Sequence, residues 1–110
     1  MKAFEVLVSA RAQRDLTVAR EYIARFAPET AERWYADFLN SLTCLEQDPH
    51  VRPLAPENDQ FSFELRQYIF RSASGKANRA LFTIVGSQVR ILAVRRPGQP
   101  LVQPADLQDD

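Results

Sequence analysis

Residues 79–95 read RALFTIVGSQVRILAVR, and this stretch predicts a β-hairpin. Two runs rich in β-branched residues, 79–85 and 88–95, are separated only by Gly86 and Ser87. Glycine as the first of two loop residues is typical of a type II′ turn, which suits the twist of the strands it joins. We therefore expect two adjacent antiparallel strands, and the rest of the chain must cover the apolar face of their sheet.

Two more strands are expected outside this hairpin. Residues 61–66 alternate apolar Phe61, Phe63 and Leu65 with polar neighbours, which is the period of a strand that extends to about Arg71. The alternation is lost over residues 67–70, so either both faces are covered there or a bulge intervenes. Residues 72–77 contain Gly75 and predict a turn, and residues 2–8 predict a first strand.

Two helices are expected between the first strand and the others. Ser9 can cap the first helix, whose apolar stripe recurs at helical spacing: Ala12, Leu16, Ala19, Ile23 and Phe26. Pro28 suits the start of the second helix, which we expect to run to about Gln47. Its stripe is Ala31, Trp34 or Tyr35, Phe38, Leu42 and Leu45. The two helical patterns are separated only around Ala27 and Pro28. A connection this short predicts an antiparallel helical hairpin, which would pack on the sheet.

The expected fold is α+β, in the order β-α-α-β-β-β, with the helical hairpin on a twisted, mainly antiparallel sheet. We expect one domain, residues 1–110, because the length fits a single core. Residues 50–60 are interrupted by prolines and predict an exposed connection. Residues 99–110 predict a flexible tail, since Pro100 and Pro104 argue against another strand.

The composition excludes several classes of protein. It is 45% hydrophobic and 25% charged, which is ordinary for a globular domain, and no apolar run approaches the roughly 20 residues of a membrane helix. The first residues are interrupted too soon by Arg11 and Arg14 to form a signal peptide. One cysteine, Cys44, rules out an internal disulfide and indicates a cytoplasmic protein. With one histidine, His50, no metal or other cofactor is expected.

The net charge of zero conceals an uneven distribution. Residues 1–58 hold seven Lys or Arg and nine Asp or Glu. Residues 62–98 hold a single acid, Glu64, against seven bases: Arg66, Arg71, Lys76, Arg79, Arg90, Arg95 and Arg96. A basic sheet beside a more acidic helical layer indicates an acidic or polyanionic partner for the sheet.

The order of these segments resembles the RelE/ParE superfamily, the bacterial toxins of type II toxin–antitoxin pairs. The resemblance is diffuse but covers about 95 residues, and it is closer to the ParE branch. It is carried by residues 8–16 at the strand-to-helix opening, residues 21–23 and 28–34 in the helical hairpin, and residues 65–66, 79–84 and 89–95 in the sheet. The resemblance implies that the chain is the toxin of a toxin–antitoxin system of the plasmid-stabilisation kind and inhibits growth. It also implies that a cognate antitoxin silences the toxin by binding it in a hetero-oligomer.

The superfamily's two best-known activities differ, and the residues leave both open. ParE-type members poison DNA gyrase and are not nucleases, whereas RelE-type members are mRNA interferases that cut mRNA on the ribosome. For a metal-independent nuclease, the resemblance implies that Arg66, Arg79 and Arg95 are catalytic cations, because arginine holds phosphate with two bonds. Arg71, Lys76, Arg90 and Arg96 are the expected contacts to nucleic acid or another target.

The acid and base of such a nuclease are missing from the expected places. The turn before Arg79 offers only Lys76, and residues 97–100 contain no Tyr or His. Whether the chain is an enzyme therefore stays open. A third alternative is an inactive toxin fold that serves as a binding module. An acidic antitoxin would complement the basic sheet and cover Arg79 and Arg95.

Each singled-out residue also has a purely structural interpretation. The cations of residues 61–96 can form the solvated face of a sheet, and Arg95 and Arg96 can protect a strand edge. Tyr68 is a weak candidate for catalysis, because an aromatic residue within an apolar strand is usually in the core. His50 is interpreted as incidental and Cys44 as buried filler. Ser74, Gly75 and Lys76 match only part of a phosphate-binding loop.

Overall fold

The hairpin at residues 77–95 forms the centre of a four-stranded sheet with the strand order β1-β4-β3-β2. In this computed structural model, which describes residues 3–73 and 75–107, β3 spans Ala77–Val85 and β4 spans Gln88–Arg95. Gly86 lies in the turn at φ 60°, a conformation that costs glycine little because it has no Cβ. The predicted hairpin is confirmed.

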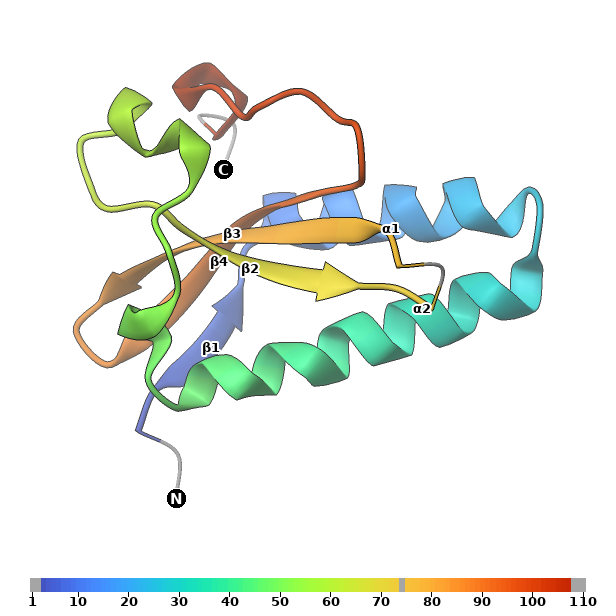
Figure 1. Ribbon diagram of the computed structural model, residues 1–110, viewed down its shortest axis with the longest axis horizontal. Helices are drawn as coiled ribbons and strands as arrows, with labels where there is room; N and C mark the ends of the chain where they lie inside the picture. The colour runs from blue at the N-terminus through green and yellow to red at the C-terminus, as the bar shows by residue number, and fades with distance from the viewer. Residues whose placement is uncertain (1–2, 74, 108–110) are drawn as a thin grey trace.

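The two outer strands pair differently. β2, Arg66–Arg71, pairs antiparallel with β3, and β1, Glu5–Val8, pairs parallel with β4 (Figure 1). The expected α+β fold with a mainly antiparallel sheet is therefore confirmed. Of the expected first strand, Lys2 lies outside the described residues, and residues 3–4 precede the strand.

A bulge lies at the centre of the sheet. Leu81 pairs with Ala93 and Phe82 pairs with Ile91, which leaves Leu92 as an extra residue in β4. Successive residues of β3 then face two different cores. Ala80 and Phe82 face the helices, whereas Leu81 packs on the opposite side with Ala93.

The helical hairpin covers one face of the sheet. Helix α1, Ala10–Ala24, begins where the Ser9 hydroxyl accepts a hydrogen bond from the Ala12 amide at 3.0 Å, so the predicted cap is confirmed. Helix α2, Pro28–Ser41, begins at Pro28 as predicted. The two helices lie antiparallel below and behind the sheet in Figure 1. Their buried residues include Leu16, Trp34 and Phe38, and Tyr35 is only half-buried.

Two irregular segments cover the other face of the sheet. Residues 53–65 and residues 96–107 close over a second, smaller core made of Ala55, Leu65, Leu81, Ala93 and Val102. The segments contain 3₁₀ turns at Pro56–Gln60 and Pro104–Leu107. Residues 50–60 were expected to be exposed, yet Ala55 and Glu57 are buried. Within the predicted flexible tail, Val102 is fully buried, and residues 108–110 lie outside the described part of the chain.

Three local expectations are wrong. Phe26 is 76% exposed, because α1 ends at Ala24 and the chain turns before Phe26 reaches the core. The second helix stops at Ser41, and Leu42–Glu46 continues it as a 3₁₀ turn. No strand forms at residues 61–65, because the backbone of Leu65 bonds instead to the Ala55 amide and the Asn58 side chain.

Within the described residues, no helix combines the length and the hydropathy that a membrane span requires.

Candidate functional site

Arg79, the first expected catalytic residue, is held by a buried carboxylate. Its Nη1 and Nη2 donate to Glu57 Oε1 and Oε2 at 2.8 and 2.9 Å, and Nη1 also donates to Gln67 Oε1 at 3.1 Å. The Glu57 side chain is fully buried, and that of Arg79 is 16% exposed. Both terminal nitrogens of Arg79 are therefore used within the fold, in the paired geometry that would otherwise hold a phosphate.

Glu57 is also bound to the C-terminal segment. Its Oε2 accepts a hydrogen bond from the Val102 amide at 2.9 Å. Burial raises the pKa of Glu57, but the hydrogen bonds from Arg79 and Val102 and the charge of Arg79 outweigh burial, so the pKa lies below its ordinary value. The carboxylate stays charged and keeps strand β3, residues 53–65 and residues 96–107 together.

The three expected catalytic arginines do not form one cluster. Arg95 is the cross-strand neighbour of Arg79, and its Nε is buried without an acceptor among the described residues. Arg66 on β2 lies directly opposite Phe82 on β3, and the side chain of Phe82 faces the helices. Residues opposite each other in a sheet share a face, so the side chain of Arg66 leaves the sheet on the face opposite that of Arg79. Arg66 donates to the Arg52 carbonyl at 2.6 Å and to Glu64 Oε1 at 3.2 Å. The catalytic role of these arginines stays a prediction.

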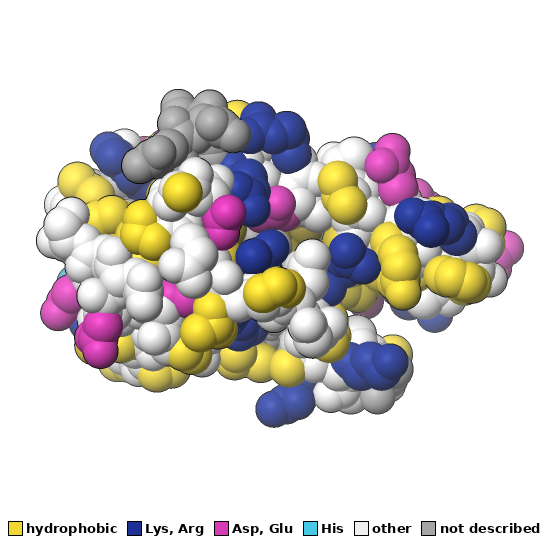
Figure 2. All heavy atoms as spheres, turned by 90° about the horizontal axis from the view of Figure 1, so that it is seen from above, with side chains coloured by type: hydrophobic (Ala, Val, Ile, Leu, Met, Phe, Trp, Pro, Cys, Tyr) yellow, Lys and Arg dark blue, Asp and Glu magenta, His cyan; other side chains and the backbone are white. Residues whose placement is uncertain are grey.

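Two of the four expected target-binding residues meet at a cleft. A cleft of about 370 Å³ lies between the end of the helical hairpin and the β2–β3 turn, and both Lys76 and Arg96 line it. The guanidinium of Arg96 lies 4.4 Å from the ring centre of Tyr22 on α1. In the view from above, the outline of the molecule is notched at this end, with Lys and Arg side chains on both sides (Figure 2).

The other two expected target-binding residues lie outside this cleft. Arg71, at the end of β2, is exposed and donates to the Gly75 carbonyl at 3.3 Å. Arg90 lies toward the other end of β4 and donates to Gln88 at 2.9 Å. An open hollow on the far side of Lys76 and Arg96 reaches Arg79 and Gln99, so these two cations border both spaces.

A third hollow contains His50, which the sequence analysis interprets as incidental. It measures about 580 Å³ and brings His50 together with Glu64, Arg66 and Arg90. The ring of His50 also lies 5.7 Å from that of Phe4. These residues come from segments far apart in the sequence, so no local spacing could have shown the group. His50 and Glu64 are both exposed.

The remaining candidates have structural surroundings. Tyr68 packs against the helix-side core, with the guanidinium of Arg52 at 5.3 Å from its ring centre. Cys44 is half-buried, and its Sγ accepts from Arg52 Nη2 at 3.4 Å. Ser74 of the partial phosphate loop lies outside the described residues. Across residues 3–73 and 75–107, no group of three His, Cys, Asp or Glu side chains is placed to hold a metal ion.

Comparison with known proteins identifies a similar fold but no relative in sequence. No profile of a known family matches the chain, and no curated protein matches it in sequence. Nine chains of solved structures match in shape. One belongs to a structure described as a chromosomal ParDE TA system from P. aeruginosa, with a TM-score of 0.69 and 18% identity over 86% of this chain and 97% of that one. The expected RelE/ParE-like fold is confirmed.

Proposed function

We propose that the chain is the toxin of a type II toxin–antitoxin pair and inhibits growth by poisoning DNA gyrase, as ParE-type proteins do, until a cognate antitoxin binds. The likeness in fold to a chain of a ParDE system supports a toxin. The choice of gyrase over mRNA rests on one observation. Arg79, which a nuclease would need for its phosphate, is bound on both terminal nitrogens by Glu57.

The cover over the basic face of the sheet supports the same choice. A nuclease must place its substrate against its cations, but residues 53–65 and 96–107 pack over the core on the face that Arg79 shares with Leu81. The hollow that still reaches Arg79 meets a guanidinium whose terminal nitrogens are already bound to Glu57. A protein that acts by binding gyrase needs no such access. Lys76, which is exposed, and Arg96, which is half-buried, line the cleft at the end of the helical hairpin and are available to a large partner.

The mRNA interferase is the second candidate, and a specific group favours it. His50 can act as a base, and Arg66 and Arg90 can stabilise a phosphate in the third hollow. This site differs from the arginine cluster that the resemblance implies. An inactive binding module is the remaining alternative, and it predicts normal growth.

Arg33 of α2 lines the same cleft as Lys76 and Arg96. The test is to express the wild-type chain and the variants H50A and R33E/K76E in a bacterial host. Plasmid supercoiling and mRNA integrity on translating ribosomes are followed in parallel, and purified protein is added to a gyrase supercoiling reaction. The proposal predicts that the wild-type chain lowers plasmid supercoiling and leaves mRNA intact. H50A should lower supercoiling as much as the wild type does, and R33E/K76E should lower it less. Arg79→Ala is a poor discriminator, because it also leaves Glu57 buried without its partner.

If mRNA is fragmented while plasmid supercoiling stays normal, the target is mRNA and not gyrase. In that case H50A should lower the cleavage rate on the order of 10²-fold, the usual contribution of a general base. Normal growth, with neither lesion, would leave only a binding module.

A further inference from the structure

We propose that the cleft at the end of the helical hairpin binds an acidic segment of a partner protein, which inserts one apolar side chain between the helices and the sheet. The site deepens the proposed function in that it locates a partner, but binding there does not require the chain to be toxic. The cleft is about 370 Å³, within the range of clefts that hold ligands.

The floor of the cleft is apolar. Ile23 of α1, Trp34 of α2 and Phe70 of β2 line it, and Trp34 is only 6% exposed. Tyr22 stands at the side, 43% exposed. Such a floor offers contact to an aliphatic or aromatic side chain, and filling it removes apolar surface from water.

The rim of the cleft is basic. Arg33, Lys76 and Arg96 line it, against a single acid, Asp37. The ion pairs found among the described residues include none of these three cations, so their charges are not neutralised within the fold. Arg79 on the sheet, by contrast, is paired with Glu57. An acidic ligand is therefore attracted to the cleft more than to Arg79.

An apolar stripe beside the cleft favours a protein as the ligand. Val18, Tyr22 and Phe26 follow one another at four-residue spacing on and just beyond α1, and they are 54%, 43% and 76% exposed. The rings of Tyr22 and Phe26 touch at 5.8 Å between centres. Exposed apolar surface next to a pocket is typical of protein interfaces. The stripe extends the cleft along α1, so a peptide chain can follow it.

The single acid on the rim argues against a nucleic acid. A nucleic acid strand carries a phosphate on every nucleotide and would bring one near Asp37, where like charges repel. A polypeptide can place its carboxylates against Arg33, Lys76 and Arg96 alone and leave a neutral residue opposite Asp37. The charge pattern of the rim thus selects a peptide with acids at chosen positions.

The probe is a library of displayed 12-residue peptides, selected on the full-length chain. We expect enriched peptides to combine an aromatic or leucine residue with flanking Asp or Glu. Fluorescence anisotropy of the leading synthetic peptide then compares wild type with R33E/K76E and with R33K/K76R. Reversal of both charges should weaken binding tenfold or more, on the order reported for interfacial charge pairs, whereas the charge-keeping variant should bind within about threefold of wild type.

A second variant tests the floor independently of charge. T30W places a large side chain at the lining of the cleft while all three rim cations remain, and it should abolish binding of the same peptide. Circular dichroism and thermal melting show that each variant is folded. Equal binding to R33E/K76E, or binding that survives T30W, would overturn the proposal.

Competition with the bound peptide distinguishes the other possible ligands of the cleft. A 20-nucleotide single-stranded RNA or DNA that displaces the peptide from the wild type and is lost with R33E/K76E would overturn the proposal in favour of nucleic acid. Self-association of the wild type that R33E/K76E removes would assign the cleft to a second copy of the chain. Peptide binding in the absence of any growth arrest would uphold this inference while rejecting the proposed toxin.

Discussion

At the scale of single residues, Glu57 links three parts of the fold that are distant in sequence. Its carboxylate bonds Arg79 on β3 and the amide of Val102, and the residue itself lies in the 3₁₀ turn Pro56–Gln60. Removing one member of a buried ion pair leaves the other charge without compensation, which costs several kcal/mol. The stability of both irregular segments should therefore depend on this one side chain.

We predict that Glu57→Gln lowers the free energy of unfolding by about 3 kcal/mol at pH 7. The amide keeps the volume of the carboxylate but not its charge, so Arg79 stays buried beside a neutral group. Urea unfolding measures the change. Asp59→Asn is the matched control, because Asp59 is exposed in the same turn and should change stability by less than about 0.5 kcal/mol. If both variants lost a similar amount of unfolding free energy, Glu57 would contribute no more to stability than an exposed acid of the same turn.

The pH dependence of stability gives a second test of the same residue. Since the pKa of Glu57 is lowered by folding from its ordinary value of 4.5, the unfolded chain takes up this proton first as the pH falls. The contribution of Glu57 is complete above about pH 4.5 and is lost as the pH drops toward the folded-state pKa. We predict a shallower loss of stability between pH 5 and about pH 3 for Glu57→Gln than for wild type. Parallel curves would contradict it.

Sequence reasoning identified Arg79 but not its partner. Arg79 is one of seven bases against one acid in residues 62–98, and the resemblance to the RelE/ParE superfamily assigned it a role on phosphate. Glu57 lies 22 positions earlier, in a proline-containing segment without periodicity, and only the fold brings it against β3. His50 is the same case, since its neighbours Glu64, Arg66 and Arg90 reach it only through the fold. Charge counts reveal an excess but do not show which charges are already paired.

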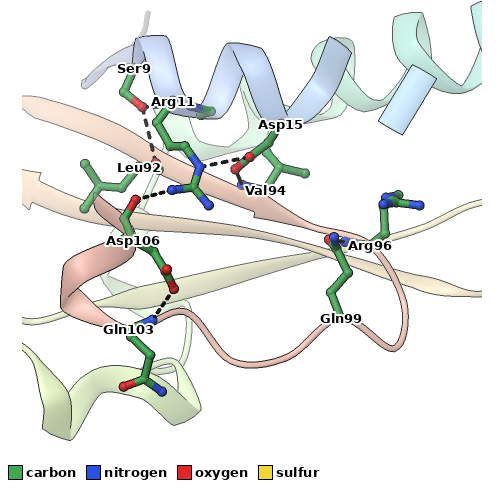
Figure 3. A network of polar contacts seen from close by, with 10 residues as sticks. Ser9, Arg11, Asp15, Leu92, Val94, Arg96, Gln99, Gln103 and Asp106 are labelled. Carbon is green, nitrogen blue, oxygen red and sulfur yellow. Dashed lines mark hydrogen bonds and ion pairs between the residues drawn. The ribbon is translucent and has the colours of Figure 1, made fainter. Parts of the chain in front are cut away.

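At the scale of elements, the start of helix α1 closes a gap in the sheet. Strand β1 pairs with β4 only as far as Val8 and Ile91. Beyond that point the Ser9 hydroxyl donates to the Leu92 carbonyl at 3.3 Å, and Asp15 Oδ2 accepts from the Val94 amide at 2.9 Å (Figure 3). The helix therefore supplies the partners that a longer β1 would have given to β4.

We predict that Asp15→Ala costs about 2 kcal/mol of stability, because the Val94 amide loses its acceptor in a half-buried site. Hydrogen exchange at that amide should accelerate, while the amides of the β3–β4 hairpin near Gly86 should stay protected. Asp15→Asn keeps an acceptor oxygen and should recover at least half of the loss. Glu21→Ala, an exposed change on the same helix, should have little effect. Exchange at Val94 that does not change would contradict the capping role.

Elements with local signals were predictable, and elements held by distant contacts were not. The hairpin at residues 77–95 carries a glycine turn between β-rich runs, and α1 carries a cap and a stripe, so both were recovered. Residues 61–65 alternate like a strand but lie outside β2, because Ala55 and Asn58 capture the backbone of Leu65. Hydrophobic alternation alone does not show which backbone partners will be available.

At the scale of the whole molecule, the sheet is covered on both faces by layers of different kinds. The helical hairpin packs on the core that contains Phe82, and residues 96–107 pack on the core that contains Leu81 (Figure 1). The C-terminal segment is anchored at two points. Val102 is fully buried and bonds Glu57, and Arg11 of α1 donates to the Asp106 carbonyl (Figure 3).

We predict that this segment is part of the folded domain rather than a flexible appendage. A chain that ends at Leu101 loses the Val102 side chain and one hydrogen bond to Glu57, and it should lose about 3 kcal/mol of stability. Val102→Ala, which keeps the backbone bond, should lose about 2 kcal/mol. A chain that ends at Leu107 retains both anchors and is the control, so its unfolding in urea should match that of the full chain. If the shortest chain were as stable as the other two, the second core would contribute nothing to the fold. The Arg79–Glu57 pair would then have to stand without the segment that covers it.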